Sequence, residues 1–202
     1  MRILQSSIAL LAAACITGPA VAGIDHRLNF DDSGIWARSN QKAVQYLSAL
    51  VVLGGALYEG NDTPLGRTFW QATESMLAAD LAAEGLKRLT RRARPDQGND
   101  PNDWFGSSHH RSFPSGEVTH ITAVVTPFIA RYGSEHPEVW ALAALPVYVG
   151  VARMKAQAHW QSDVLAGAAL GAGIGWWESR RDSAWIVGVL PRGLTVGYRR
   201  AF

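Results

Sequence analysis

The sequence predicts an all-α protein: a helical bundle of about five core helices with a short carboxyl-terminal β-hairpin. Apolar side chains recur at helical spacing along most of the chain, turn-forming residues separate these stretches, and two short strand-like segments come near the end. With 202 residues, 48% of them apolar, the chain can bury the core of one domain and is too short for two ordinary ones.

Five segments have the pattern expected of core helices. They are Gln41–Tyr58, Thr68–Thr90, Ser115–Tyr132, Val139–Arg153 and Gln161–Ser179. Ser115 is expected to cap the third helix through its side-chain oxygen, and Pro146 to kink the fourth. The polar segment Pro95–Phe113 between the second and third helices is long enough to suggest a function beyond connection.

The carboxyl-terminal part of the chain combines a glycine-spaced helix with the predicted hairpin. Glycine recurs every four residues from Gly167 to Gly175, which predicts a helix face that packs closely against a neighbour. After that helix, Ala184–Leu190 and Leu194–Arg200 flank the turn residues Pro191-Arg192-Gly193, a pattern typical of two short paired strands.

The first 22 residues have the pattern of a secretory signal peptide. Arg2 precedes an apolar centre, Ile8–Ile16, and Ala20-Val21-Ala22 forms a small-residue cleavage site before Gly23. We therefore expect a signal peptide over residues 1–22 and a mature domain over residues 23–202 in the periplasm. An uncleaved membrane anchor is the alternative.

Charge and cysteine content restrict the class of partner. The 19 Lys and Arg residues against 17 Asp and Glu give a net charge of only +2, which argues against a nucleic-acid partner. The single cysteine excludes a disulfide framework and a four-thiolate zinc site. The longest charge-free stretch after the signal, Ala43–Tyr58, has 16 residues, whereas a spanning helix needs about 20, so we expect a soluble or membrane-surface domain. A membrane-embedded bundle is the alternative, because short helices can tilt or thin the bilayer.

The first candidate functional segment is a pair of cations at the end of the second helix. Lys87 and Arg94 are seven residues apart, which is two helical turns, so both side chains can converge on one anion. Taken alone, the basic run over residues 87–94 is more typical of a solvated face or a membrane-surface patch.

Two further segments complete the candidate site. Ser115 and Gly116 place a hydroxyl group and free backbone N–H groups at a helix start, where phosphate binds well, although capping explains the serine equally well. His159 and Asp163 are four residues apart, so the carboxylate can accept one ring N–H and leave the other nitrogen free to attack. Arg153 precedes them as a third cation.

In this order and spacing the segments resemble the phosphatidic acid phosphatase type 2 and vanadium haloperoxidase superfamily. That family has the pattern Lys-x6-Arg-Pro, Pro-Ser-Gly-His and Ser-Arg-x5-His-x3-Asp. The sequence has Lys87 to Pro95, Pro114 to Glu117 and Ala152 to Asp163 in the corresponding places, so the resemblance covers residues 87–163 and indicates a bacterial periplasmic phosphatase-like member.

The resemblance implies a metal-independent phosphatase acting on phosphate monoesters or lipid (pyro)phosphates. His159 would attack phosphorus to form a phosphohistidine, Asp163 would orient the imidazole, and water would then release phosphate. The residues implied to hold the phosphoryl oxygens are Lys87, Arg94, Ser115, Gly116 and Arg153. We expect no metal or other cofactor. The expected partner is a phosphorylated small molecule or lipid, with possible membrane-surface association and with no nucleic acid or protein partner.

Two positions depart from the family pattern. Ala152 replaces the usual serine, and Glu117 replaces the histidine that protonates the leaving oxygen in the family. An ionised carboxylate repels phosphate, so Glu117 can serve only if its pKa is raised or if an arginine neutralises it. We expect Glu117 to act as a protonated acid that works best below neutral pH. His120, three residues further on, is an alternative donor, and His109 and His110 are others if the polar loop folds over the pocket.

Three other interpretations stay open on the sequence. A vanadate-dependent haloperoxidase would use the same pocket with vanadate bound. A weakly active or non-catalytic envelope protein would bind phosphate without fast turnover. A metal site built from the Glu117 and His120 pair and the His159 and Asp163 pair is the third, although three nearby cations would be unusual neighbours for a metal.

Overall fold

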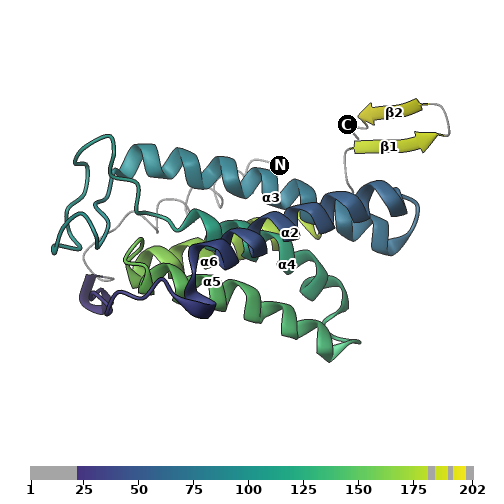
Figure 1. The fold of residues 1–202 in the computed structure, drawn as a ribbon. Coiled ribbons are helices and arrows are strands. Elements are labelled where there is room, and N and C mark those ends of the chain that lie inside the picture. Colours follow the sequence, from purple (N-terminus) through teal and green to yellow (C-terminus); the bar gives the residue numbers. More distant parts are fainter. Residues whose placement is uncertain (1–21, 182–184, 191–192, 199–202) are drawn as a thin grey trace.

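The protein folds into a bundle of five α-helices, described by a computed structural model over residues 22–181, 185–190 and 193–198 (Figure 1). The elements are, in chain order, η2 (Ala22–Ile24), η3 (Gly34–Trp36), α2 (Arg38–Glu59), α3 (Pro64–Thr90), α4 (Gly116–Tyr132), η4 (Pro137–Ala143), α5 (Ala144–Lys155), α6 (Gln161–Glu178), β1 (Trp185–Leu190) and β2 (Gly193–Tyr198). The predicted signal peptide lies outside the described residues except for Ala22 and stays a prediction.

The expectation of an all-α bundle with about five core helices is confirmed. The two strands pair antiparallel, with Trp185 opposite Tyr198 and Leu190 opposite Gly193. They lie at one end of the bundle, where β1 contacts α2 (Figure 1), so the bundle itself contains no sheet layer in the part of the chain that the structure describes. The outer ends predicted for the two strands, Ala184 and Arg200, lie outside the described residues.

The helix that contains Pro146 differs from the prediction. Instead of one kinked helix over residues 139–153, the chain forms the 3-10 helix η4 and then the α-helix α5, which begins at Ala144. Pro146 therefore lies in the first turn of α5, where backbone N–H groups have no partner inside the helix. A proline there removes no helical hydrogen bond, which is why it causes no break within the helix.

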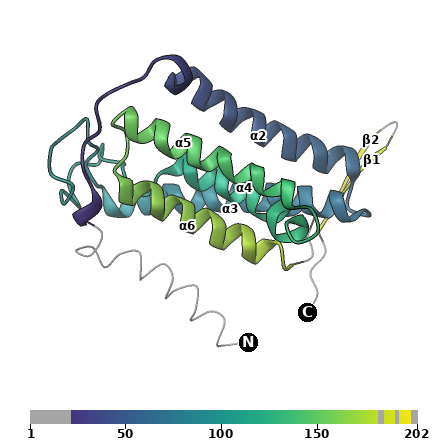
Figure 2. The same ribbon diagram turned by 90° about the horizontal axis from the view of Figure 1, so that it is seen from below.

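The central helix of the bundle is α4, which contacts each of the other four α-helices (Figure 2). Buried apolar side chains around it form the core: Val52, Ala72, Met76, Val118, Ile121, Val124, Val125 and Val149. The predicted close-packing face of α6 is confirmed against α4, because a Cβ atom at Gly167 would lie 2.6 Å from the Ser115 carbonyl oxygen, and one at Gly171 only 2.3 Å from the Thr119 carbonyl oxygen. Only glycine allows this approach, which brings the starts of α4 and α6 together.

Candidate active site

His159 lies between α5 and α6, and its imidazole is buried. Its Nδ1 atom is 2.7 Å from the carbonyl oxygen of Ser112. Because a carbonyl only accepts hydrogen bonds, Nδ1 carries the ring proton and Nε2 keeps its lone pair. Burial, reinforced by the positive charges of Lys87 and Arg153, lowers the pKa of His159 to about 3 in spite of the nearby Asp163 carboxylate. The imidazole is therefore neutral near pH 7, as a nucleophile must be.

Asp163 orients this imidazole through Ser112 rather than directly. Its Oδ2 atom is 3.8 Å from His159 Nδ1, but it accepts hydrogen bonds from Ser112 Oγ at 2.5 Å and from the Trp160 N–H at 2.8 Å. The sequence predicted a hydrogen bond from the His159 ring to the Asp163 carboxylate, and this prediction is wrong. The reason is that α6 begins only at Gln161, so His159 precedes the helix and the helical i,i+4 geometry does not apply to it.

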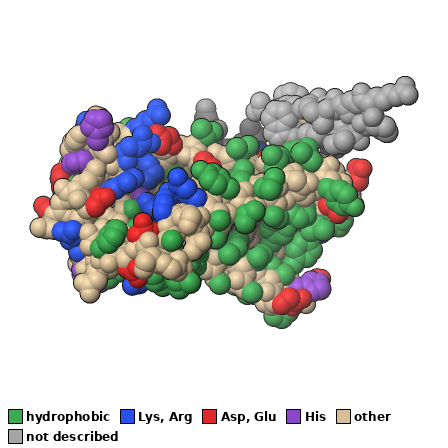
Figure 3. Space-filling model, viewed as in Figure 1, with side chains coloured by type: hydrophobic (Ala, Val, Ile, Leu, Met, Phe, Trp, Pro, Cys, Tyr) green, Lys and Arg blue, Asp and Glu red, His purple; other side chains and the backbone are tan. Residues whose placement is uncertain are grey.

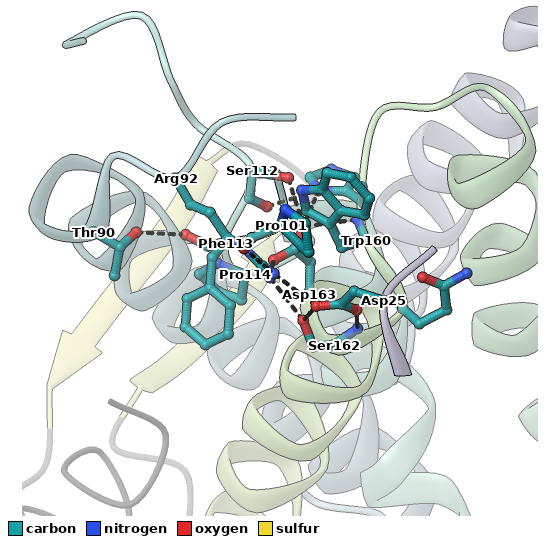
Figure 4. A network of polar contacts seen from close by, with 12 residues as sticks. Asp25, Thr90, Arg92, Pro101, Ser112, Phe113, Pro114, Trp160, Ser162 and Asp163 are labelled. Atoms are coloured by element: carbon teal, nitrogen blue, oxygen red, sulfur yellow. Dashed lines mark hydrogen bonds and ion pairs between the residues drawn. The ribbon is translucent and has the colours of Figure 1, made fainter. Parts of the chain in front are cut away.

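A buried arginine holds the Asp163 carboxylate (Figure 4). Arg92 Nη1 donates to Asp163 Oδ1 at 2.5 Å and to Ser162 Oγ at 2.7 Å, and its guanidinium lies over the ring of Trp104 at 4.4 Å. Burial would raise the pKa of Asp163, but hydrogen bonding and the charge of Arg92 outweigh it and keep that pKa below its usual range. Asp163 is therefore ionised and fixed in place.

The same network includes Asp25, near the beginning of the described chain. Asp25 Oδ2 accepts hydrogen bonds from Arg92 Nη2 and from Ser162 Oγ, each at 2.7 Å, and its Oδ1 accepts the Ser162 N–H at 2.8 Å. Sequence reasoning missed Asp25, Arg92 and Ser112, because each acquires its role from partners far away in the chain. The only signal was the basic run over residues 87–94, and it predicted a solvated face for an arginine that is 1% exposed.

Lys87 lies beside the start of α4, as the sequence predicts for a phosphate-binding cation. Its Nζ atom donates to the carbonyl oxygens of Arg111 at 3.1 Å and Pro114 at 2.6 Å. A Cβ atom at Gly116 would lie 3.3 Å from Lys87 Cε, so the lysine passes directly against the first residue of the helix. Burial, with the nearby charge of Arg94, lowers the pKa of Lys87 to about 8.

Arg153 and Arg94 bring two more positive charges to the same place. Arg153 Nη1 donates to Gln41 Oε1 at 3.0 Å, and burial lowers the pKa of this arginine to about 10. The charges of Arg94 and Arg153 both act on the pKa of Lys87, and the charges of Lys87 and Arg153 act on that of His159. The structure therefore brings together the three cations and the histidine that the sequence singled out.

Three buried polar atoms of the predicted phosphate-binding residues have no hydrogen-bond partner among the described residues: Arg94 Nε, Arg153 Nε and Ser115 Oγ. Ser115 occupies the N-cap position of α4, but its side chain makes no capping hydrogen bond, so the predicted capping contact is wrong. Buried polar groups are normally paired, and unpaired ones mark places where a ligand binds. Two guanidinium N–H groups and a hydroxyl at a helix N-terminus match the oxygens of a phosphate group.

The protonation state of Glu117 is where the structure and the sequence prediction differ most. Both of its carboxylate oxygens accept hydrogen bonds from the guanidinium of Arg38, the first residue of α2. Burial would raise the pKa of Glu117, but the hydrogen bonds from Arg38 and the charge of Arg153 outweigh it and lower this pKa. The expectation that Glu117 keeps a proton because its pKa is raised is therefore wrong. The other condition derived from the sequence, neutralisation by an arginine, is the one found.

The alternative donor, His120, points to a different partner. Its Nδ1 atom lies 3.0 Å from Asp80 Oδ2 on α3, although it shares a helix with Glu117. His120 is thus paired with the Asp80 carboxylate, whereas Glu117 is paired with the Arg38 guanidinium. Within the described ranges, the structure brings no three His, Cys, Asp or Glu side chains together as metal ligands, so the metal site considered from the sequence is not assembled.

Comparison with known proteins gives a family and a fold. The family model of the PAP2 superfamily matches residues 68–185. A lipid A 1-phosphatase of Rhizobium johnstonii is 36% identical over 104 residues, covering 48% of this chain and 41% of the relative. A lipid A 1-phosphatase of Porphyromonas gingivalis is 29% identical over 183 residues, covering 87% of this chain and 38% of the relative. The chain thus spans about two-fifths of the length of these curated relatives.

A solved structure shares the arrangement of the helices. It is the transmembrane PAP2-type phosphatidylglycerolphosphate phosphatase of Bacillus subtilis, with a TM-score of 0.52 and 18% identity over 88% of this chain and 85% of that one. In the described part of the present chain, no helix is both long and apolar enough to cross a membrane. At 18% identity, the similarity to this structure is evidence for the fold alone.

Proposed function

The chain belongs to the PAP2 superfamily, and from this premise we propose that it is a metal-independent phosphatase that acts through a phosphohistidine intermediate. The observation that carries the proposal is a set of buried donors without a hydrogen-bond partner, Arg94 Nε, Arg153 Nε and Ser115 Oγ, in the same site as a neutral histidine. Such donors bind a tetrahedral oxyanion, and the free Nε2 lone pair of His159 supplies the nucleophile.

The reaction has two balanced steps. Nε2 of His159 forms a bond to phosphorus while the bond from phosphorus to the leaving oxygen breaks, and that oxygen takes the electron pair. Water then attacks phosphorus, the bond between nitrogen and phosphorus breaks, and the electron pair returns to Nε2. The positive charge that develops on the ring in the first step is stabilised by the Ser112 carbonyl, which Asp163 and Arg92 hold in place.

We further propose that the substrate is a lipid phosphate reached at a membrane surface in the periplasm. Support comes from apolar side chains that solvent reaches on α2, among them Tyr46, Leu47, Leu50, Val51 and Tyr58. Figure 3 shows hydrophobic side chains gathered on one half of this face and lysine and arginine side chains on the other. A large exposed apolar patch is typical of a binding surface, and lipid A 1-phosphatases are among the relatives.

The test is the release of inorganic phosphate from p-nitrophenyl phosphate and from a phosphorylated lipid in detergent micelles. We expect His159→Ala to lower kcat by at least about 10³-fold because it removes the nucleophile. His136→Ala is the matched control, since His136 lies in the exposed turn before η4. An alkali-stable, acid-labile phosphoryl label on the wild-type protein would support the intermediate. Equal kcat values for the His159→Ala and His136→Ala variants would refute the phosphohistidine mechanism.

A further inference from the structure

The short connection between α5 and α6 carries His159 and has an unusual backbone two residues earlier, at Gln157. The φ of Gln157 is 51°, a left-handed conformation that residues other than glycine rarely adopt. The Gln157 N–H donates to the Met154 carbonyl at 3.0 Å, and the Ala158 N–H donates to the Arg153 carbonyl at 3.1 Å. These are the two bonds of a Schellman motif, which ends a helix and usually has glycine in the place of Gln157. The backbone therefore favours glycine there, and the reason for glutamine lies in its side chain.

The side chain of Gln157 binds residues 25–31, which we call the amino-terminal segment. Its Oε1 atom accepts a hydrogen bond from Arg27 Nη2 at 2.7 Å, and its Nε2 atom donates to the Leu28 carbonyl oxygen at 2.8 Å. The amide is thus bound at both of its polar atoms. The amino-terminal segment passes the start of α6 before the chain reaches α2 (Figure 2). Strained backbone persists only where the surrounding structure holds it, and here the amino-terminal segment does so.

The amino-terminal segment also binds the chain on both sides of Gln157. Before Gln157, the Lys155 carbonyl oxygen accepts a hydrogen bond from the Asp31 N–H at 3.1 Å. After it, the His26 N–H donates to Gln161 Oε1 at 3.0 Å, and Gln161 Nε2 donates back to the His26 carbonyl oxygen at 2.9 Å. The segment therefore fixes the end of α5 and the start of α6, and the nucleophile lies between these two points.

The main chain of Gln157 links the same connection to the loop that carries Arg94. The Gln157 carbonyl oxygen accepts a hydrogen bond from the N–H of Asp96 at 3.1 Å, two residues after Arg94. Arg153 is joined to the same turn through the Schellman motif, and His159 follows it by two residues. Gln157 is thus in contact with the chain beside the nucleophile and beside two of the phosphate-binding cations. Its conformation therefore affects where the imidazole lies relative to a bound anion.

We propose that Gln157 is a positioning residue for the reaction: by binding the amino-terminal segment it fixes the main chain at His159 and so aims Nε2 at the bound phosphoryl group. The inference rests on the proposed phosphatase function. Gln157 itself takes no part in the chemistry, because both polar atoms of its amide are bound to the segment. A displacement of about 1 Å can lower the rate of an enzyme about 10²-fold. The segment lies outside residues 68–185, so this support comes from a part of the chain beyond the family match.

The decisive variant is Gln157→Gly, which removes both side-chain hydrogen bonds but suits the left-handed backbone. We expect a folded protein whose kcat for p-nitrophenyl phosphate is about 10- to 100-fold lower than that of the wild type. The inhibition constant of inorganic phosphate should stay within about threefold, because the cations that bind the anion are unchanged. A folded variant with a kcat within about twofold of wild type would overturn the inference. So would an inhibition constant that weakens by the same factor as kcat, because that result indicates a general disruption of the site.

Variants of Arg27 test the same contact from the other side. Arg27→Ala removes one of the two partners of Gln157 and leaves the left-handed turn unchanged, so we expect kcat to fall at least about threefold. Phe30→Ala is the matched control, because Phe30 is 66% exposed in the same segment, and its kcat should stay within about twofold. In the Gln157→Gly background, Arg27→Ala should lower kcat by no more than about a further twofold, since the two residues act through one contact. Independent effects that multiply would overturn the inference.

The outcomes distinguish this inference from the proposed function. Circular dichroism shows whether each variant folds, and if Gln157→Gly does not, Arg27→Ala decides: a wild-type kcat in that variant overturns the inference. A folded wild-type protein without phosphatase activity would refute the proposed function, and the inference with it. Wild-type activity that His159→Ala abolishes but that neither Gln157→Gly nor Arg27→Ala lowers would leave the function intact and overturn the inference alone. The result we expect is a lower kcat in both variants with phosphate inhibition preserved.

Discussion

Asp25 offers the sharpest test of how the site is held together. Its side chain is fully buried and accepts three hydrogen bonds, two from Ser162 and one from Arg92. The Asp25→Ala variant removes the acceptor for all three and breaks a buried ion pair. Breaking such a pair typically costs about 3–5 kcal/mol, because the remaining charge stays buried and uncompensated.

This loss is a large part of the stability of an ordinary domain, whose free energy of unfolding is about 5–15 kcal/mol. For a domain of this size it corresponds to a fall in Tm of roughly 6–20 °C. Thermal and urea unfolding followed by circular dichroism measure it. Asp62→Ala is the control, because Asp62 is exposed in the turn between α2 and α3, and we expect a change within about 0.5 kcal/mol.

The same variant should also affect the chemistry. Without Asp25, Arg92 keeps its contacts with Asp163, Ser162, the Pro101 carbonyl and the Trp104 ring but loses one of its two carboxylate partners, so the carboxylate that positions Ser112 and His159 becomes less well fixed. Well below the Tm, we expect kcat to fall while KM changes little, since the cations that bind phosphate are untouched. If Asp25→Ala unfolds within about 1 kcal/mol of wild type, the buried network does not hold the site as described.

Two further predictions concern helix packing and pH. Gly171→Ala should destabilise the protein by about 1–3 kcal/mol, because the new Cβ would lie 2.3 Å from the Thr119 carbonyl oxygen. The control is Gly173→Ala on the exposed side of α6, which should be neutral or stabilising. Equal urea midpoints for the two variants would contradict the close approach of α4 and α6. The affinity for inorganic phosphate, measured as its inhibition constant, should weaken as the pH rises through about 8, because Lys87 loses its proton there rather than near its ordinary pKa of 10.5. A constant value between about pH 7.5 and 9 would show that Lys87 does not bind the anion.

Local spacing predicted the parts of the site that one helix or one turn can position. Ser115 and Gly116 stand at a helix start, so the sequence alone placed them. Lys87 and Arg94 contribute to the same site, but the two helical turns predicted between them are wrong, because α3 ends at Thr90 and Arg94 lies beyond the helix. The glycine spacing of α6 likewise predicted close packing, which a Cβ at Gly171 would prevent. In each case the information lies within a few residues.

The parts that failed depend on distant partners. The protonation state of Glu117 depends on Arg38, which is 79 residues away in the chain. No sequence pattern near Glu117 predicts that contact. Arg92 is buried because Asp25 and Asp163 meet on either side of it, and these two residues are 138 positions apart in the chain. Pairings of this kind arise only when the helices pack, so they become visible in the fold and not in the spacing.

The origin of Arg38 in α2 has a consequence for protein engineering. The three sequence blocks from Lys87 to Asp163 contain the nucleophile and the phosphate-binding cations, but the partner of Glu117 enters from the first helix of the bundle. A transplant of those blocks onto another helical scaffold would keep only Arg153, 3.7 Å from Glu117, as its counter-charge and would lose both hydrogen bonds from Arg38. Such a chimaera would need α2 as well, or a replacement of the glutamate, to restore the balance of charge beside the phosphate site.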